Sequence, residues 1–230
     1  MIKKLDWDST FFKKEIGKVI VNDLDEWNQI EKKFYNSGFD LLYVFTNTSV
    51  DHHTLDTIQS ETEFHDIKLT YQLKPDHKIE KCNSIRELKV LSPELESLAL
   101  RAGIYSRFNR DSKLKEMFPL FYKQWIYNSL FGDYADLVLG YHKENDKLCG
   151  MITLKKQQEQ LRIGLISVGS EHSGHGIGKK LIHSAIYWAK ELNLSSIIVD
   201  TQEINQEAVK FYLSSGFKLI NKTHIFHKWK

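Results

Sequence analysis

Cysteine, proline and long apolar runs are scarce in this 230-residue sequence, and each scarcity excludes a class of protein. Two cysteines, Cys82 and Cys149, are too few for a disulfide framework, so we expect buried free thiols. Three prolines and twelve glycines exclude a collagen-like chain. No apolar run approaches the ~18 residues that a membrane-spanning helix needs. Residues 1–8 also lack the apolar stretch of a signal peptide, so we expect a cytoplasmic protein with no membrane partner.

An excess of charge of one sign is also missing. The 32 basic and 30 acidic residues are interspersed and leave a formal net charge of +2. No basic stripe is present, so we expect no nucleic-acid partner. A hydrophobic content of 41% excludes intrinsic disorder. Surface scaling predicts that a chain of this length buries about 70% of its surface, enough for one large domain or two small ones.

The first eighty residues alternate short strands and helices. The patterns predict strands at residues 15–21, 39–46 and 66–73, a helix opened by an Asp at residues 25–36 and a polar helix at residues 52–59. Residues 74–83 turn polar and favour a linker, although a surface loop inside one domain has the same composition. We therefore predict a small N-terminal α/β domain over residues 1–80 and a second domain over residues 81–230.

The predicted second domain begins with residues typical of a helix N-terminus and continues with a further helix and three strands. Ser92, Pro93 and Glu94 combine a cap, a proline at the first helical position and an acid in the first turn. Apolar spacing predicts a further helix over residues 118–131. Strands are predicted at residues 136–142, 147–155 and 161–168, with a hairpin connection at residues 143–146.

A glycine-rich turn follows the last of these strands. Gly174, Gly176 and Gly178 form G-x-G-x-G immediately before an amphipathic helix. A strand, a glycine turn and a helix N-terminus together make a phosphate cradle, because backbone N–H groups and the helix dipole face the anion. The spacing fits neither a P-loop nor a dinucleotide-binding fingerprint. A flexible loop that merely tolerates glycine is the alternative.

A second pattern lies beyond the turn. Residues 196–201 have the composition of a buried strand, and Asn205 precedes a helix with Ala208, Tyr212 and Gly216 at intervals of four. This order resembles the GNAT superfamily of acyl-CoA-dependent N-acyltransferases over about residues 137–229. The resemblance implies an α/β (α+β) GNAT fold, in which a mixed, mostly antiparallel central sheet is flanked by helices and preceded by a smaller N-terminal α/β domain.

The resemblance also implies a set of site residues. In the family, the strand before the turn is splayed, so backbone groups near Ile166, Ser167 and Val168 would meet the pantetheine and thioester of acetyl-CoA. Asn205 would contact pantetheine, with a helix N-cap as the other reading. Tyr212 would be the general acid, with a core tyrosine as the alternative. The pyrophosphate would lie on the turn, which consists of Ser173, Gly174, His175, Gly176, Ile177, Gly178 and Lys179.

Ser173 departs from the family, which usually has Gln or Arg before the first glycine. That departure affects one side-chain contact with the cofactor, but the backbone N–H groups of the cradle do not depend on it. No general base is visible: His172 and His175 could titrate near pH 7, but the position of His175 in the motif faces phosphate. We expect no metal site, because the nearest third ligand, His183, would lie further along the helix.

A narrower resemblance covers nearly the whole chain. Residues 5–12, 106–108 and 121–126 resemble the dTDP-fucosamine acetyltransferase family, whose members acetylate the 4-amine of a dTDP-linked 4-amino-4,6-dideoxyhexose for surface polysaccharide assembly. The implied partner is a small molecule, a dTDP-amino sugar. Arg107 would meet its diphosphate, with a surface ion pair as the alternative. Trp7, Phe11 and Phe12 could stack on a base, but we expect them in a core.

Other functions remain open at this point. The chain could be a GNAT enzyme for another primary amine, such as a polyamine, an amino acid or a protein N-terminus. It could also be a non-catalytic CoA-binding module, although such a module would not need Tyr212. An α/β scaffold whose glycine loop binds nothing is the remaining reading. The sequence leaves a homodimer open.

Overall fold

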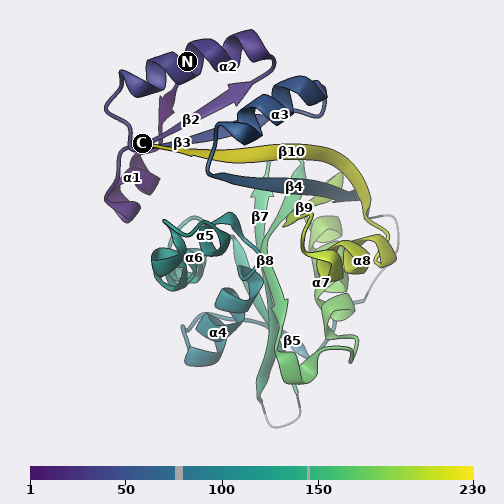
Figure 1. The fold of residues 1–230 in the computed structure, drawn as a ribbon. Helices are drawn as coiled ribbons and strands as arrows, with labels where there is room; N and C mark the ends of the chain where they lie inside the picture. Colours follow the sequence, from purple (N-terminus) through teal and green to yellow (C-terminus); the bar gives the residue numbers. More distant parts are fainter. Residues whose placement is uncertain (76–79, 144–145) are drawn as a thin grey trace. The chain divides into compact units, whose positions relative to one another are not determined.

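The computed structural model describes residues 1–75, 80–143 and 146–230, which form two compact units. The first unit contains residues 1–69, 202–204 and 221–230, and the second contains residues 70–201 and 205–220. Strands β4 (Phe64–Leu73) and β10 (Lys218–Trp229) contribute residues to both units. Figure 1 shows the elements with the labels used below.

In the first unit, the strands follow the order β1-β2-β3-β10-β4. Strand β3 pairs in parallel with β2 and antiparallel with β10, so β3 is central and carries an almost continuous buried run. The helices cover a core that includes Trp27, Phe34, Ile58 and Phe226. The other elements of this unit are β1 (Lys3–Lys4), α1 (Asp6–Phe12), β2 (Ile16–Val21), α2 (Leu24–Tyr35), β3 (Leu41–Thr46) and α3 (His52–Ser60).

The first unit differs from expectation in two details. Helix α2 begins at Leu24 and is capped by Asp23, whose carboxylate accepts the Glu26 N–H, so the acid that opens it precedes the predicted range. Of the three aromatic residues expected in a core, Phe12 is buried, whereas Trp7 is 38% exposed and stacks on Phe11 with ring centroids 5.0 Å apart. The Trp7 side chain is therefore partly exposed at the surface of helix α1.

In the second unit, the strands follow the order β4-β9-β8-β7-β6-β5. Helices α4 and α6 lie on one side of β7 and β8, and helices α7 and α8 lie on the other (Figure 1). The elements are β5 (Ile85–Glu87), α4 (Pro93–Ala102), α5 (Arg107–Arg110), η1 (Lys115–Met117), α6 (Phe118–Phe131), β6 (Leu137–His142), β7 (Leu148–Gln157), β8 (Gln160–Val168), η2 (Ser170–His172), α7 (Ile177–Glu191), β9 (Ser196–Gln202) and α8 (Gln206–Ser214).

The predicted sheet is confirmed: it is mixed, mostly antiparallel and flanked by helices. The helix start at Ser92 is also confirmed, because its hydroxyl accepts the Leu95 N–H at 3.2 Å. Parts of the predicted linker (residues 76–79) and hairpin (residues 144–145) lie outside the described residues. Strand β10 was not predicted, although it extends over twelve residues.

The two compact units divide the chain differently from the predicted boundary at residues 80 and 81. Residues 221–230 belong to the first unit, because β10 pairs with β3 from Thr46–His224 to Leu41–Trp229. The division into domains over residues 1–80 and 81–230 stays a prediction. Both cysteines are free; Cys149 is buried and Cys82 is partly exposed. Among the described residues, no helix combines the length and apolar character needed to span a membrane.

Candidate active site

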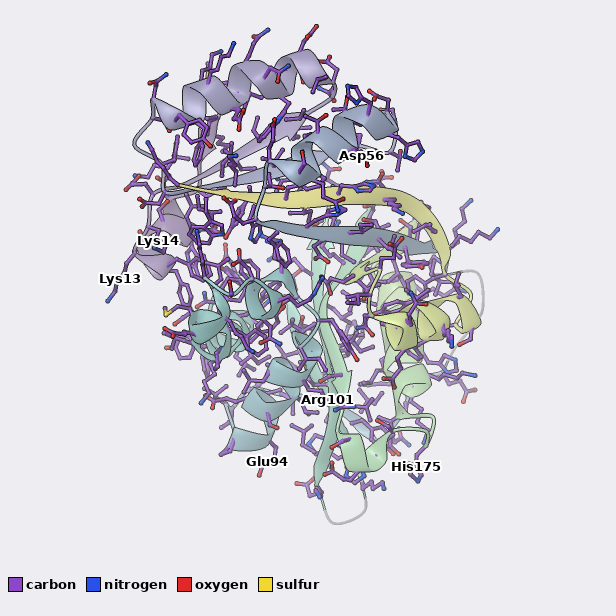
Figure 2. All side chains as sticks on the ribbon, viewed as in Figure 1. Lys13, Lys14, Asp56, Glu94, Arg101 and His175 are labelled. Atoms are coloured by element: carbon purple, nitrogen blue, oxygen red, sulfur yellow. The ribbon has the colours of Figure 1, made fainter. Side chains whose placement is uncertain are left out.

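A cavity of about 450 Å³ lies within the second unit, where the end of β8, the glycine turn, α4 and α8 converge. Tyr212 lines it, together with every predicted acetyl-CoA residue except His175. The exposed His175 lies on the outer side of the turn (Figure 2), where its Nδ1 is 2.9 Å from the Ser173 carbonyl oxygen. The structure thus brings the residues of two separate sequence patterns to one cavity.

The glycine turn has the backbone conformation of a cradle. Gly174 and Gly176 have φ angles of +79° and +74°, which residues with a side chain rarely adopt. A Cβ added at either glycine would meet no heavy atom of the described residues within 4 Å, so the space beside these two glycines is open. Gly176 is the N-cap of α7 and provides no side-chain cap, which leaves the first N–H groups of the helix available to an anion.

Strand β8 separates from β9 next to this turn. Over residues 160–168 and 196–201, the register of β8 with β9 runs from Gln160–Ser196 to Ile163–Val199 and then stops. On its other side, β8 continues to pair with β7 as far as Val168–Gly150. The two parallel strands therefore separate after Ile163, as predicted for the backbone near Ile166–Val168.

A β-bulge in β8 accompanies the separation. Thr153 on β7 stands opposite both Gly164 and Leu165, because the register shifts between Ile152–Ile166 and Leu154–Ile163. The buried Thr153 hydroxyl accepts the Leu165 N–H at 2.8 Å and so replaces the missing ladder acceptor. A Cβ at Gly164 would lie 2.8 Å from the same Oγ1, so the hydroxyl requires glycine there. Thr153 and Gly164 together shape the strand that leads to the cavity.

Removing the Thr153 hydroxyl should loosen this bulge. The nearly isosteric Thr153→Val leaves the buried Leu165 N–H unpaired, which should lower the free energy of unfolding by about 1–3 kcal/mol. Thr153→Ser retains the acceptor and serves as the matched control. Denaturant unfolding and calorimetry with CoA would measure both variants. Equal stability and equal CoA affinity for the Val and Ser variants would contradict the role of the hydroxyl.

Helix α4 fixes the end of β8 through two side-chain hydrogen bonds. Arg101 Nε donates to the Val168 carbonyl oxygen at 2.7 Å, and Ser167 Oγ donates to the Leu98 carbonyl oxygen at 2.6 Å. The Val168 carbonyl group is therefore already bonded to protein. Arg101 itself lines the cavity and lies beside β8 in Figure 2. Sequence patterns did not indicate Arg101, because they located the start of α4 but not the strand against which its end packs.

Asn205 serves as an N-cap and also lines the cavity. Its Oδ1 accepts the Ala208 N–H at 3.1 Å and caps α8, which confirms the cap interpretation. The same residue belongs to the cavity lining, so its amide NH₂ group remains a candidate donor to a ligand. The N-cap role of Asn205 is therefore observed, and its contact with pantetheine stays a prediction.

Tyr212 lines the cavity and is buried among aromatic side chains. It is 4% exposed, and its ring lies 5.9 Å from that of Tyr71 and 5.5 Å from that of Phe217. Burial raises the pKa of its phenol above the ordinary value, and the negative charge of Asp200 raises this pKa further. Asp200 is held in place by Thr70 Oγ1 at 2.6 Å and Arg162 NH1 at 2.8 Å. Tyr212 is consequently protonated at neutral pH.

Positive groups outnumber negative groups in the cavity lining. The described lining contains the basic side chains of Arg101 and Lys179 and the carboxylate of Glu207. Arg107 is absent from the described lining; its guanidinium carbon lies 4.3 Å above the Phe108 ring. Its predicted contact with an acceptor diphosphate therefore stays a prediction.

His172 also lines the cavity, with its Nδ1 3.3 Å from the ammonium nitrogen of Lys143. In that contact the ammonium donates and the imidazole accepts. Among the described residues, no group of three or more His, Cys, Asp or Glu side chains is placed to hold a metal ion.

Comparison with known proteins places the site in a family. The model of the Acetyltransferase (GNAT) family matches residues 101–217. The chain is 33% identical over 73 residues to N-acetyltransferase 8B of Homo sapiens, covering 32% of each chain. It is 30% identical over 125 residues to dTDP-fucosamine acetyltransferase of Escherichia coli O6:H1, covering 54% of this chain and 53% of the relative. The chain thus spans about a third of the length of the first relative and about half of the length of the second.

A solved structure gives the same class of fold. A functionally unknown conserved protein from Staphylococcus epidermidis superposes with a TM-score of 0.62 at 18% identity, over 94% of this chain and 84% of that one. A likeness at this identity concerns the fold alone and agrees with the predicted GNAT fold. The chain belongs to the Acetyltransferase (GNAT) family, because the family model covers half of it, including the turn and Tyr212. The predicted family membership is confirmed.

Proposed function

We propose that this protein is an N-acetyltransferase that moves an acetyl group from acetyl-CoA to the 4-amine of a nucleotide-linked 4-amino-4,6-dideoxyhexose. The observation that carries the transferase part is the shared cavity, which is lined by the glycine turn, the end of β8 that has separated from β9, and Tyr212. Members of the matched family are acetyltransferases. The acetyl-acceptor part rests on the similarity to the Escherichia coli enzyme.

The open concave side of the turn fits a pyrophosphate group. The two glycines with positive φ leave space for phosphate oxygens, and the first N–H groups of α7 would donate to them. Lys179 adds a positive charge at the cavity lining. Acetyl-CoA supplies an acyl thioester, and the unpaired edge of β8 would hold its pantetheine arm through backbone groups. A backbone N–H at this edge would also stabilise the developing oxyanion.

Tyr212 would donate the proton that the reaction needs. The amine nitrogen of the acceptor attacks the thioester carbonyl, a C–N bond forms and the C–S bond breaks, and the sulfur leaves with the bonding electron pair. The Tyr212 hydroxyl protonates that sulfur, the nitrogen releases one proton to water, and a proton from water then restores the Tyr212 phenol. The raised pKa of the phenol ensures that the donor carries its proton at neutral pH. Ordered water suffices as the base, so no further side chain is required.

The acceptor assignment can be tested with a panel of amines. Acetyl-CoA would be combined with dTDP- and UDP-linked 4-amino sugars, the free amino sugar, polyamines, amino acids and a peptide N-terminus, while thiol release is followed. We expect the amino-sugar nucleotides to give the highest kcat/KM. Removing the nucleotide should lower kcat/KM by about tenfold or more, because binding energy remote from the amine is lost.

Assays without acceptor control for thioester hydrolysis. A clear preference for a polyamine, amino acid or peptide would agree with the acetyltransferase activity but contradict the assignment of a sugar acceptor. Binding of CoA without thiol release for any acceptor would favour a non-catalytic CoA-binding module. A cytoplasmic location and a homodimer stay predictions.

A further inference from the structure

A second cavity of the second unit lies between α7, the end of α8, the end of β4 and the start of β10. Its volume of about 670 Å³ is within the range of small-molecule sites, about 300–1,000 Å³. Four basic side chains line it, together with an apolar wall that includes Ile182 and Ile186. We call it the lysine pocket and define it by Lys74, Lys179, His183 and Lys218.

The described residues place no carboxylate against the positive charge of the lysine pocket. Among the residues that the structure describes, the pocket lining contains no Asp or Glu, and the ammonium groups of Lys74, Lys179 and Lys218 make no ion pair. Other lysines in the chain are paired, such as Lys123 with Glu96 at 2.8 Å and Lys222 with Glu203 at 2.9 Å. Three unpaired ammonium groups around one cavity repel one another, and an anion would relieve this repulsion.

The basic groups come from separate parts of the chain. Lys74 follows β4, Lys218 begins β10, Lys179 belongs to the first turn of α7, and His183 stands one turn further along that helix. Only Lys179 also lines the candidate active site, among the described residues of the two cavities. The pocket is therefore assembled by the tertiary fold and is not an extension of the glycine turn.

We propose that the lysine pocket binds a phosphate monoester carried by an organic ligand. Such a group has a charge of about −1.5 to −2 at pH 7 and three strong acceptor oxygens, which match several ammonium donors. Lysine binds phosphate as a point charge and needs no bidentate geometry. The apolar wall of Ile182, Ile186 and Ile220 favours a phosphate attached to an organic body over inorganic phosphate.

Two sources could supply this phosphate. One is the 3′-phosphate of CoA, in which case the inference rests on the proposed function; the shared Lys179 would then connect the two cavities. The other is a separate phosphorylated small molecule that binds beside the cofactor. The chemistry recognised by the pocket is the same for both, and dephospho-CoA, which lacks only the 3′-phosphate, distinguishes them.

The test compares ligands across three proteins by calorimetry at one fixed salt concentration. The proteins are the wild type, the double variant Lys74→Gln/Lys218→Gln and the control Lys156→Gln/Lys210→Gln. The control removes the same charge from positions outside the described linings of both cavities. The ligands are CoA, dephospho-CoA, and adenosine 5′-monophosphate titrated into protein saturated with dephospho-CoA. Thermal melting verifies that each variant is folded.

If CoA supplies the phosphate, the wild type and the control should bind CoA at least about tenfold more tightly than dephospho-CoA, and the double variant should lose that preference. If a separate ligand supplies it, CoA and dephospho-CoA should bind equally, and the double variant should weaken adenosine 5′-monophosphate by about tenfold. The inference is overturned if the double variant behaves like the control toward all three ligands. If no CoA compound binds the wild type, the proposed function fails, and the same monophosphate titration on the free protein still tests the pocket.

Discussion

Replacing Tyr212 by Phe should lower kcat by about 10²–10⁴-fold and leave the Kd for acetyl-CoA unchanged. The substitution removes only the phenolic proton donor, and proton transfer by a positioned side chain contributes a factor of this size. The ring would still pack against Tyr71 and Phe217, so the fold around the cavity should persist. Steady-state kinetics under conditions in which chemistry is rate-limiting, with calorimetry for acetyl-CoA, would measure both quantities.

The pH profile of the wild type gives a second readout of the same role. A general acid must carry its proton, and burial together with Asp200 raises the pKa of the Tyr212 phenol above its ordinary value of about 10. Deprotonation of Tyr212 should therefore cause no loss of kcat on the alkaline side until the pH exceeds about 10. Tyr71→Phe is the matched control, because Tyr71 is equally buried and outside the described cavity lining. Equal kcat for Tyr212→Phe and Tyr71→Phe would exclude Tyr212 as the acid.

Replacing Gly176 by Val should weaken CoA binding by at least about tenfold, or about 1.4 kcal/mol. A Cβ at this position meets nothing within 4 Å, so the loss does not come from a clash inside the protein. It comes from the φ of +74°, which a β-branched residue avoids, and from a side chain in space that the cradle keeps open for phosphate. Calorimetry with CoA measures the effect.

Gly38→Val is the matched control for that variant. A Cβ added at Gly38 also meets nothing within 4 Å, but Gly38 lacks a positive φ and belongs to the first unit. Its CoA affinity should equal that of the wild type. An unchanged affinity in a folded Gly176→Val protein would mean that the turn is not the phosphate cradle.

Local sequence patterns were sufficient to predict many of the helices and strands. Helix α6 spans the predicted residues Phe118–Phe131, because its apolar spacing is helical throughout. Strand β10 escaped prediction because Lys, Asn and His interrupt its sequence. Its second half is nevertheless buried, and Lys228 remains there because its ammonium group pairs with Glu31 at 3.0 Å. The sequence shows the polar residues of β10 but not the partners that allow their burial.

Some residues of the candidate site were also predictable from local sequence, whereas others depend on tertiary contacts. The glycine turn and Tyr212 belong to compact motifs, whose residues lie within one strand, turn or helix. The glycine spacing indicated the turn, and the resemblance to the GNAT superfamily indicated Tyr212. Arg101 and Thr153 act on β8 from other elements; Arg101 and the Val168 carbonyl group that it contacts are 67 positions apart. Such pairs become visible only when the register of β7 and β8 and the docking of α4 are known.

The position of β10 has a consequence for the synthesis of the protein. Within the first unit, residues 221–229 lie between β3 and β4, which are translated far earlier. Until those residues leave the ribosome, β3 and β4 each present an unpaired strand edge, and exposed edges of this kind attract other chains. The part of the protein that is made first is therefore completed last, and its strand edges stay open to other chains for longer than its N-terminal position would suggest.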